Sequence, residues 1–241
     1  MTERKLKAVR PRLEALVSQD KDLLKALVKE ARVKLREAFL AADAGMKYAV
    51  MTAKHHEGFT LFNSRAPYSL DNPVTGGTNI SPAGRDVARE FADAMRAKGL
   101  RAGFYYSLLD WQHPDAYEMA LPNSPRPAHP RNPAVYKAYV RGHVDELLHN
   151  YGPLCTLWFD FSDAQRQGEA WGAAQLLADM RAAQPAILVN NRLFDGLENK
   201  LGDYGTPEKY VPPTGLPGMD WEVNHTLNES YGFSAHDTGW K

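Results

Sequence analysis

Asp160 is the residue with the clearest chemical potential in this sequence, because it follows the apolar run "TLWF" at residues 156–159. A carboxylate at the exit of a buried strand can serve as a nucleophile or an acid. Trp158 lies two positions earlier and therefore shares a strand face with Asp160. An aromatic ring beside a carboxylate is typical of sites that stack against a sugar. The alternative is that Asp160 caps a helix or pairs with an arginine.

Cleavage of a glycosidic bond with retention needs a second carboxyl group, about 5 Å from the first. Two glutamates in the loop-rich region downstream are candidates: Glu208 in "GDYGTPEKYV" and Glu222 in "GMDWEVNH". Glutamates in loops are by default solvated surface groups. Sequence spacing alone does not choose between these two.

His55 and His56 are adjacent in "AKHHEGF". Adjacent strand residues point to opposite faces, so the pair can share a site only where the strand ends and the chain turns. A metal site is the rival interpretation, but the pair lacks the spacing of H-E-x-x-H, and neighbours in sequence seldom bind one ion. Neutral histidines that hydrogen-bond sugar hydroxyls fit better. We expect no metal and no other cofactor.

Helices and strands are expected to alternate along the chain. The predicted strands occupy residues 46–56, the segment through 105–106, the segment ending at 158–160, and residues 187–191 and 219–227; the predicted helices cover 86–98, 134–150 and a segment of 169–186. This unit recurs about every 50 residues. Such alternation predicts parallel strands covered by helices.

Two α/β architectures use this plan, the doubly wound sheet and the (β/α)8 TIM barrel. No G-x-G-x-x-G follows the first strand and no G-x-x-x-x-G-K-[ST] occurs, which disfavours a nucleotide-binding sheet. Barrel enzymes carry their chemistry at the C-terminal strand ends. Here those ends are rich in polar and aromatic groups: His55-His56, Tyr105-Tyr106-Ser107, Trp158-Phe159-Asp160, Asn190-Asn191-Arg192 and Trp221-Glu222. The barrel is therefore favoured.

Charge and cysteine usage exclude several classes. Lys plus Arg and Asp plus Glu both number 29, so no net field attracts nucleic acid or an anionic membrane. Cys155 is the only cysteine, which excludes an intrachain disulfide and a cysteine-based zinc cluster. The N-terminus is charged from Glu3 onward and resembles no signal peptide. A cytoplasmic location is expected, although a secreted protein without its leader would look the same.

Six segments together resemble glycoside hydrolase family 29, the α-L-fucosidases. They are "KYAVMTAKHHEGFTLFNS", "GRDVAREFADAMRAKGLRAGFYYSLLDW", "NYGPLCTLWFDF", "VNNR", "GDYGTPEKYVPP" and "GMDWEVNHTLNESYGF". They follow the family's order and cover most of residues 35–235. The resemblance implies a (β/α)8-like barrel that hydrolyses α-L-fucosides with retention and without a metal. Its substrate would be a fucosylated glycan or a small fucoside.

The same resemblance implies roles for single residues. Asp160 matches the nucleophile and Glu208 the acid/base, with Glu222 as the runner-up. His55 and His56 match a pair that hydrogen-bonds fucose, with Glu57 where the family usually has Asp. The remaining substrate-binding positions match Tyr105 or Tyr106, Trp158, Arg192 and Tyr231.

The departures from the family pattern predict an incomplete barrel. Nothing resembles the family's first strand "FGIFIHWG", and residues 1–34 read instead as amphipathic helices before a catalytic domain at 35–241. About five or six strands are visible, and the last strands and a C-terminal β-sandwich are not. We expect a homo-oligomer that covers the open edges. The alternatives are a fucose-binding pseudo-enzyme, a fragment of low activity, or a retaining glycosidase for a related sugar such as an α-galactoside.

Overall fold

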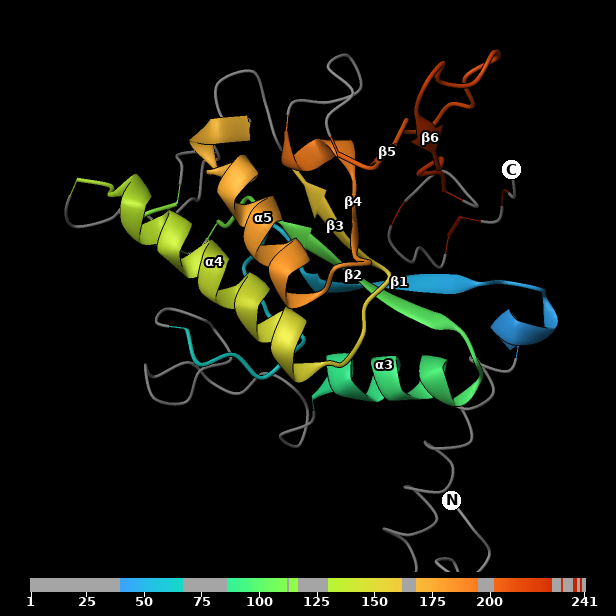
Figure 1. The fold of residues 1–241 in the computed structure, drawn as a ribbon, viewed down its shortest axis with the longest axis horizontal. Helices are drawn as coiled ribbons and strands as arrows, with labels where there is room; N and C mark the ends of the chain where they lie inside the picture. Colours follow the sequence, from blue (N-terminus) through green and yellow to red (C-terminus); the bar gives the residue numbers. More distant parts are fainter. Residues whose placement is uncertain are drawn as a thin grey trace, which may run out of the picture.

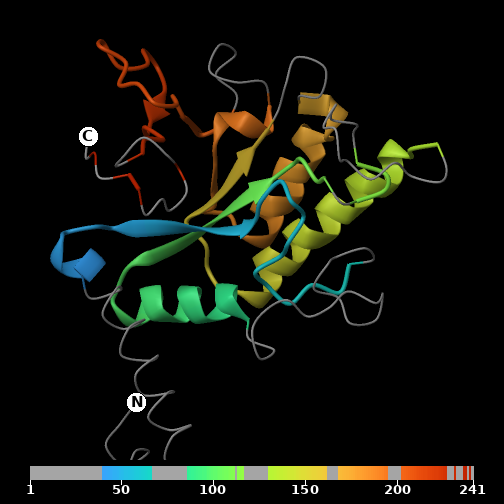
Figure 2. The same cartoon turned by 180° about the vertical axis from the view of Figure 1, so that it is seen from behind.

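The computed structural model describes residues 40–66, 86–111, 113–116, 130–161, 168–194 and 202–226, together with residues 231, 236, 237 and 239. The helices expected over residues 1–34 lie outside this part of the chain. Figures 1 and 2 show the arrangement from both sides: a twisted sheet with helices packed along one of its faces. No helix in the described ranges is long and apolar enough to cross a membrane.

Four parallel strands form the main sheet, in the order β1-β2-β3-β4. They are β1 (Tyr48–Lys54), β2 (Arg101–Ser107), β3 (Thr156–Asp160) and β4 (Leu188–Val189). The described crossovers contain α3 (Val87–Ala97), α4 (Pro133–Asn150) and α5 (Ala173–Ala183), with short 3-10 turns at η3 (Gly168–Ala170) and η4 (Asn191–Leu193). The predicted alternation of helix and parallel strand is therefore confirmed as an incomplete α/β fold.

The strands become short toward the C-terminus. The strand predicted over 187–191 is only the two residues of β4, and the one predicted over 219–227 is only β6 (Asp220–Trp221). β6 pairs in parallel with β5 (Tyr204–Gly205), a strand that the sequence analysis did not predict. A parallel bridge from Asn190 to Tyr204 joins this pair to β4. Six strands thus follow one another in chain order, as in a partial barrel.

Local capping explains where the helices begin. The Asp86 carboxylate accepts a hydrogen bond from the Arg89 amide at the start of α3. Asn132 does the same for Ala134 in α4, where Pro133 occupies the first turn without losing a needed donor. Both helices close near a glycine of positive φ, Gly99 at 70° and Gly152 at 73°, as C-terminal caps often do.

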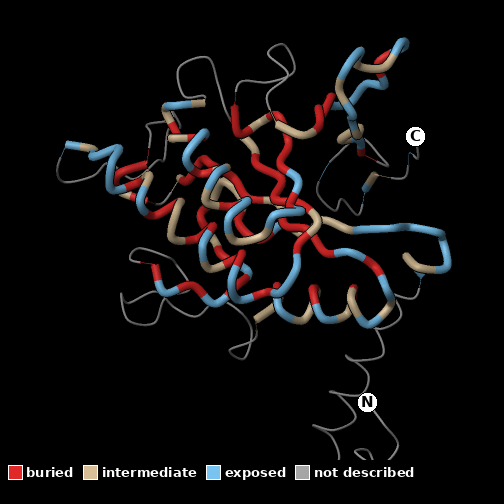
Figure 3. The backbone as a smooth tube through the Cα atoms, in the orientation of Figure 1, coloured by how far each residue is buried: buried red, intermediate tan, exposed pale blue. Residues whose placement is uncertain are grey.

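The two faces of the sheet have different fates. On the helix-covered face, alternate residues such as Phe104, Leu157, Phe159 and Val189 are fully buried in the hydrophobic core. Figure 3 shows this buried zone between the strands and the inner sides of α4 and α5. The opposite face would line the interior of a closed barrel, and it carries the alternate set that includes Tyr105 and Asp160. The site residues therefore project from the face that the helices leave open.

Gly202 allows the chain to come back alongside β4. Its φ is +89°, and a Cβ atom there would lie 2.8 Å from the backbone oxygen of Asn190. Gly202→Ala is therefore expected to lower the free energy of unfolding by about 3 kcal/mol, through left-handed strain and a clash with backbone. Urea unfolding measures the change. A loss below about 0.5 kcal/mol would contradict this packing.

Gly142 provides the matched control. It lies inside α4, and a Cβ atom there would meet nothing within 4 Å. Gly142→Ala should raise the free energy of unfolding by about 0.5–1 kcal/mol, because alanine loses less backbone entropy in a helix. The same substitution is thus expected to have opposite signs at the two positions.

Candidate active site

The carboxylate of Asp160 is held by three donors at the end of β3. Tyr105 donates to Oδ2 over 2.6 Å, and Arg192 Nη1 and the Phe161 amide donate to Oδ1 over 2.8 and 2.9 Å. Phe161 adopts a φ of 75°, a strained conformation for a residue other than glycine. The side chain of Asp160 keeps 18% of its exposure. It is therefore oriented from three sides and still open to a ligand.

Arg192 joins Asp160 to Glu208. Its Nη1 pairs with Asp160 at 2.8 Å and its Nη2 with Glu208 Oε2 at 3.0 Å. Thr206 fixes the guanidinium from behind, because its hydroxyl and carbonyl oxygens accept from Nε and Nη2. Tyr231 donates to the other oxygen of Glu208 over 3.1 Å. Two carboxylates are thus held by one planar cation.

Five side chains form a stack across the ends of the main strands. The guanidinium of Arg192 lies 4.6 Å above the Trp158 ring, which stacks on Tyr105 at 5.4 Å. Tyr105 stacks in turn on His55 at 5.7 Å, and the rings of His55 and His56 are 3.9 Å apart. Cation–π and offset aromatic contacts of this kind each add to the burial of apolar area. The stack fixes the relative places of the predicted site residues.

The two histidines do share one location, because β1 ends at Lys54 and the chain turns directly after it. His55 Nδ1 lies 2.9 Å from Glu57, and His56 Nδ1 lies 2.7 Å from the Ser107 hydroxyl. Burial, and then the neighbouring His55, lower the pKa of His56 to about 4. His56 is therefore neutral near pH 7, as a hydrogen-bonding rather than a charge-bearing role requires.

A buried ion pair beneath His56 was missed by sequence reasoning. Lys54 is fully buried, with its ammonium 3.3 Å from Asp110 and 2.8 Å from the Leu109 carbonyl oxygen. Burial lowers the pKa of Lys54, and Asp110 opposes that shift. The pair fixes the chain after β2 against the end of β1. The only signal in the sequence was a lysine at the end of an apolar run.

Tyr106 is a correction to the predicted site. It is fully buried on the helix-covered face, where its hydroxyl lies 2.9 Å from His143 Nδ1 of α4. The alternation of strand side chains explains this, since Tyr105 takes the open face and its neighbour must take the other. Tyr106 therefore belongs to the core and cannot touch a ligand at Asp160.

Trp158 and Glu222 lie deeper than predicted. Trp158 is only 5% exposed, because Arg192 and Tyr105 cover its ring. Its indole N–H donates to Glu222 Oε1 over 2.6 Å. The aromatic ring therefore supports the side chains around Asp160 more than it offers a free surface of its own.

The arrangement suits acid–base and nucleophilic chemistry on a neutral, polar ligand. It supplies two carboxylates on one cation, a neutral histidine and several hydroxyl donors. Among the described residues, no group of three or more His, Cys, Asp or Glu side chains is placed to hold a metal ion. The predicted residues His55, His56, Tyr105, Asp160, Arg192, Glu208 and Tyr231 are all brought together here, through the contacts given above.

Comparisons with known proteins agree on one family. The family model described as Alpha-L-fucosidase matches residues 36–241. Alpha-L-fucosidase isoenzyme 1 from Paenibacillus thiaminolyticus is 41% identical, with a TM-score of 0.74 over 86% of this chain and 52% of that one. The alpha-L-fucosidase AlfC from Lactobacillus casei, solved with its alpha-L-fucose product, is 29% identical, with a TM-score of 0.65 over 86% of this chain and 64% of that one.

A human relative gives the same result with a different coverage. Plasma alpha-L-fucosidase from Homo sapiens is 33% identical over 196 residues, which are 79% of this chain and 39% of the relative. The chain thus spans about two fifths of the length of the curated relatives it matches. With a family match that covers far more than half of its residues, this chain belongs to the alpha-L-fucosidase family, glycoside hydrolase family 29.

Proposed function

We propose that the chain carries the catalytic site of a retaining α-L-fucosidase, which hydrolyses terminal α-L-fucosides of glycans or small fucosides. The observation that carries the proposal is the bridge from Asp160 through Arg192 to Glu208. A retaining site needs its two carboxyl groups about 5 Å apart, and two acids on one guanidinium are compatible with that spacing. The fucose-bound relative from Lactobacillus casei supports the choice of sugar.

The proposed reaction is a double displacement. Asp160 attacks the anomeric carbon and forms an ester bond, while the glycosidic C–O bond breaks and its oxygen takes a proton from Glu208. Glu208, now a carboxylate, then removes a proton from a water molecule. The water oxygen attacks the anomeric carbon, and Asp160 leaves as a carboxylate. Fucose is released with its configuration retained.

A panel of 4-nitrophenyl glycosides tests the function directly. The expected result is hydrolysis of the α-L-fucoside, with NMR of the first product formed showing the α-anomer. The β-L-fucoside and the α-D-galactoside serve as controls for anomer and sugar, and should react at least about 100-fold more slowly, since misplaced hydroxyls leave polar groups of the site unpaired.

Two results from this panel would contradict the proposal. Faster hydrolysis of the galactoside would assign the site to a related sugar. Fucose binding in calorimetry with no hydrolysis of any glycoside would instead identify a binding protein that has lost turnover.

We also propose that a second copy of the chain covers the open side of the sheet. Within the described residues β1 pairs only with β2, and large apolar side chains along this side are exposed, including Tyr48 at 41% and Leu188 at 48%. Uncovered strand edges promote association. Light scattering after size-exclusion chromatography should give at least twice the mass of 26.9 kDa. A monomer at micromolar concentration would rule this out.

A further inference from the structure

We propose that Glu222 is a positioning residue, which together with Tyr48 anchors Trp158 and thereby holds Arg192 and Tyr105 in place around Asp160. The inference rests on the proposed function, because it assigns how the same site is kept in register. It also separates the two glutamates that sequence spacing left open, with Glu208 at the reacting groups and Glu222 one layer below them.

Both oxygens of the Glu222 carboxylate are already occupied. Oε1 accepts from the Trp158 indole N–H over 2.6 Å, and Oε2 accepts from the Tyr48 hydroxyl. Burial, and then the hydrogen bond to Glu222, raise the pKa of Tyr48 above its ordinary value, so its hydroxyl keeps the proton that it donates. Hydrogen bonds to a carboxylate are stronger than those between neutral groups. Glu222 therefore clamps two strands, β1 through Tyr48 and β3 through Trp158.

The clamp reaches Asp160 only through other side chains. Trp158 carries the guanidinium of Arg192 on its ring and stacks on Tyr105. Those two residues are the side chains that bind the two oxygens of Asp160, at 2.8 and 2.6 Å. A tilt of the indole would therefore displace both partners of Asp160 together. This makes Glu222 part of the support of the site and not one of its reacting groups.

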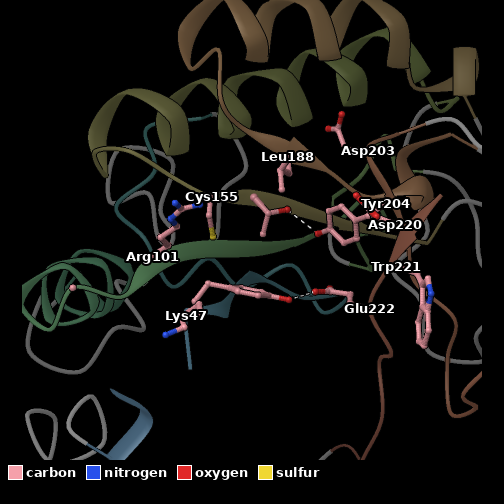
Figure 4. Close-up of a pocket in the computed structure, with 12 residues that line it drawn as sticks. Lys47, Arg101, Cys155, Leu188, Asp203, Tyr204, Asp220, Trp221 and Glu222 are labelled. Atoms are coloured by element: carbon pink, nitrogen blue, oxygen red, sulfur yellow. Dashed lines mark hydrogen bonds between the residues drawn. The ribbon is translucent and has the colours of Figure 1, made fainter. Parts of the chain in front are cut away.

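The surroundings of Glu222 point the same way. It lines a cavity of about 650 Å³ together with Tyr48, Arg101, Thr156 and Leu188, which stand at the start of the main strands. Figure 4 shows Tyr48 and Glu222 facing each other along this cavity. Asp160 lies four residues beyond Thr156, at the opposite end of β3. Trp158 lies between the two levels, as the alternation along a strand requires.

The test uses three variants and two substrates. Glu222→Gln keeps the shape, and its amide can accept from Trp158 and donate to the Tyr48 oxygen. We expect it to lower kcat/KM about fivefold, the difference between a charged and a neutral hydrogen bond. Glu222→Ala should lower kcat/KM about 100-fold, as a misplaced reacting group does. Both losses should be equal for 2,4-dinitrophenyl and 4-methylphenyl α-L-fucoside, because positioning is independent of the leaving group.

Tyr48→Phe provides an independent check of the clamp. It removes the second anchor of Glu222 and leaves every contact of Asp160 unchanged. Because both changes act on one hydrogen bond, Tyr48→Phe should cost nothing further in the Glu222→Ala background. Circular dichroism confirms that each variant is folded.

Two outcomes would overturn the assignment. One is a loss of 100-fold or more in Glu222→Gln that is confined to the 4-methylphenyl substrate and is relieved by azide on the dinitrophenyl one, which identifies an acid/base. The other is a Glu222→Ala variant within twofold of the wild type.

If the wild type hydrolyses no fucoside, the proposed function fails and tryptophan fluorescence decides the inference alone. Glu222→Gln should then shift the emission spectrum of the wild type and leave that of Trp158→Phe unchanged. An equal shift in both backgrounds would show that Glu222 does not act through Trp158.

Discussion

Replacing Asp160 by glycine is expected to lower kcat/KM for 4-nitrophenyl α-L-fucoside by about 10⁴-fold or more, as loss of a nucleophile does in other covalent mechanisms. The variant lacks the oxygen that forms the ester, while Tyr105, Arg192 and the backbone after it keep their places. Stopped and continuous assays of nitrophenol release measure the loss. Activity equal to the wild type would remove Asp160 from the mechanism.

Small anions should restore turnover in Asp160→Gly. The space left by the carboxylate is lined by Arg192 and Tyr105, both donors that suit an anion. Azide or formate bound there can attack the anomeric carbon, and azide should give the fucosyl azide of inverted configuration. Asp160→Asn is the matched control, because its amide fills the same space and should admit no rescue. Equal rescue of both variants would show that the anion binds elsewhere.

Replacing Glu208 by glutamine should produce a loss that depends on the leaving group. Without a proton donor, hydrolysis of 4-methylphenyl α-L-fucoside is expected to fall by about 10²–10⁴-fold, the usual contribution of general acid catalysis. The first step with 2,4-dinitrophenyl α-L-fucoside needs no proton and should change little. The slope of log kcat/KM against the pKa of the leaving phenol measures the difference.

Tyr231→Phe is the control for Glu208. It removes the hydroxyl that donates to Glu208 Oε1 and leaves the carboxylate itself intact. A loss of about tenfold or less, equal for both substrates, is expected from one hydrogen bond. A Glu208→Gln variant that shows the same uniform loss would exclude Glu208 as the proton donor.

The fold was predictable from the sequence where an element is long and capped. The helix predicted over 86–98 is α3, and the one over 134–150 is α4, since each has a capping side chain and a closing glycine. β5 was not predicted, because two residues, Tyr204 and Gly205, are too few to show any alternation. Its pairing comes from the tertiary placement that Gly202 permits.

The site was predictable as a set of strand ends but not as a hierarchy. Motif resemblance indicated Asp160, Arg192 and Glu208 together, and the structure joins all three. The register of β2 against β3, which pairs Tyr105 with Trp158, decided which tyrosine faces the ligand. Sequence spacing carries no register, so Tyr106 was included wrongly. The clamp on Trp158 depends on Tyr48, 174 residues away from Glu222, a contact that no local pattern encodes.

The position of Arg192 between two acids has a consequence for the charge of the site during turnover. On the proposed path Asp160 changes from anion to neutral ester while Glu208 changes from neutral acid to anion, and the second half-reaction reverses both. Arg192 contacts both groups, so one negative neighbour remains beside it in each half-reaction. The guanidinium thus keeps a constant counterion while the bonds around it are exchanged. A lysine, with a single nitrogen, would be balanced in only one half of the cycle.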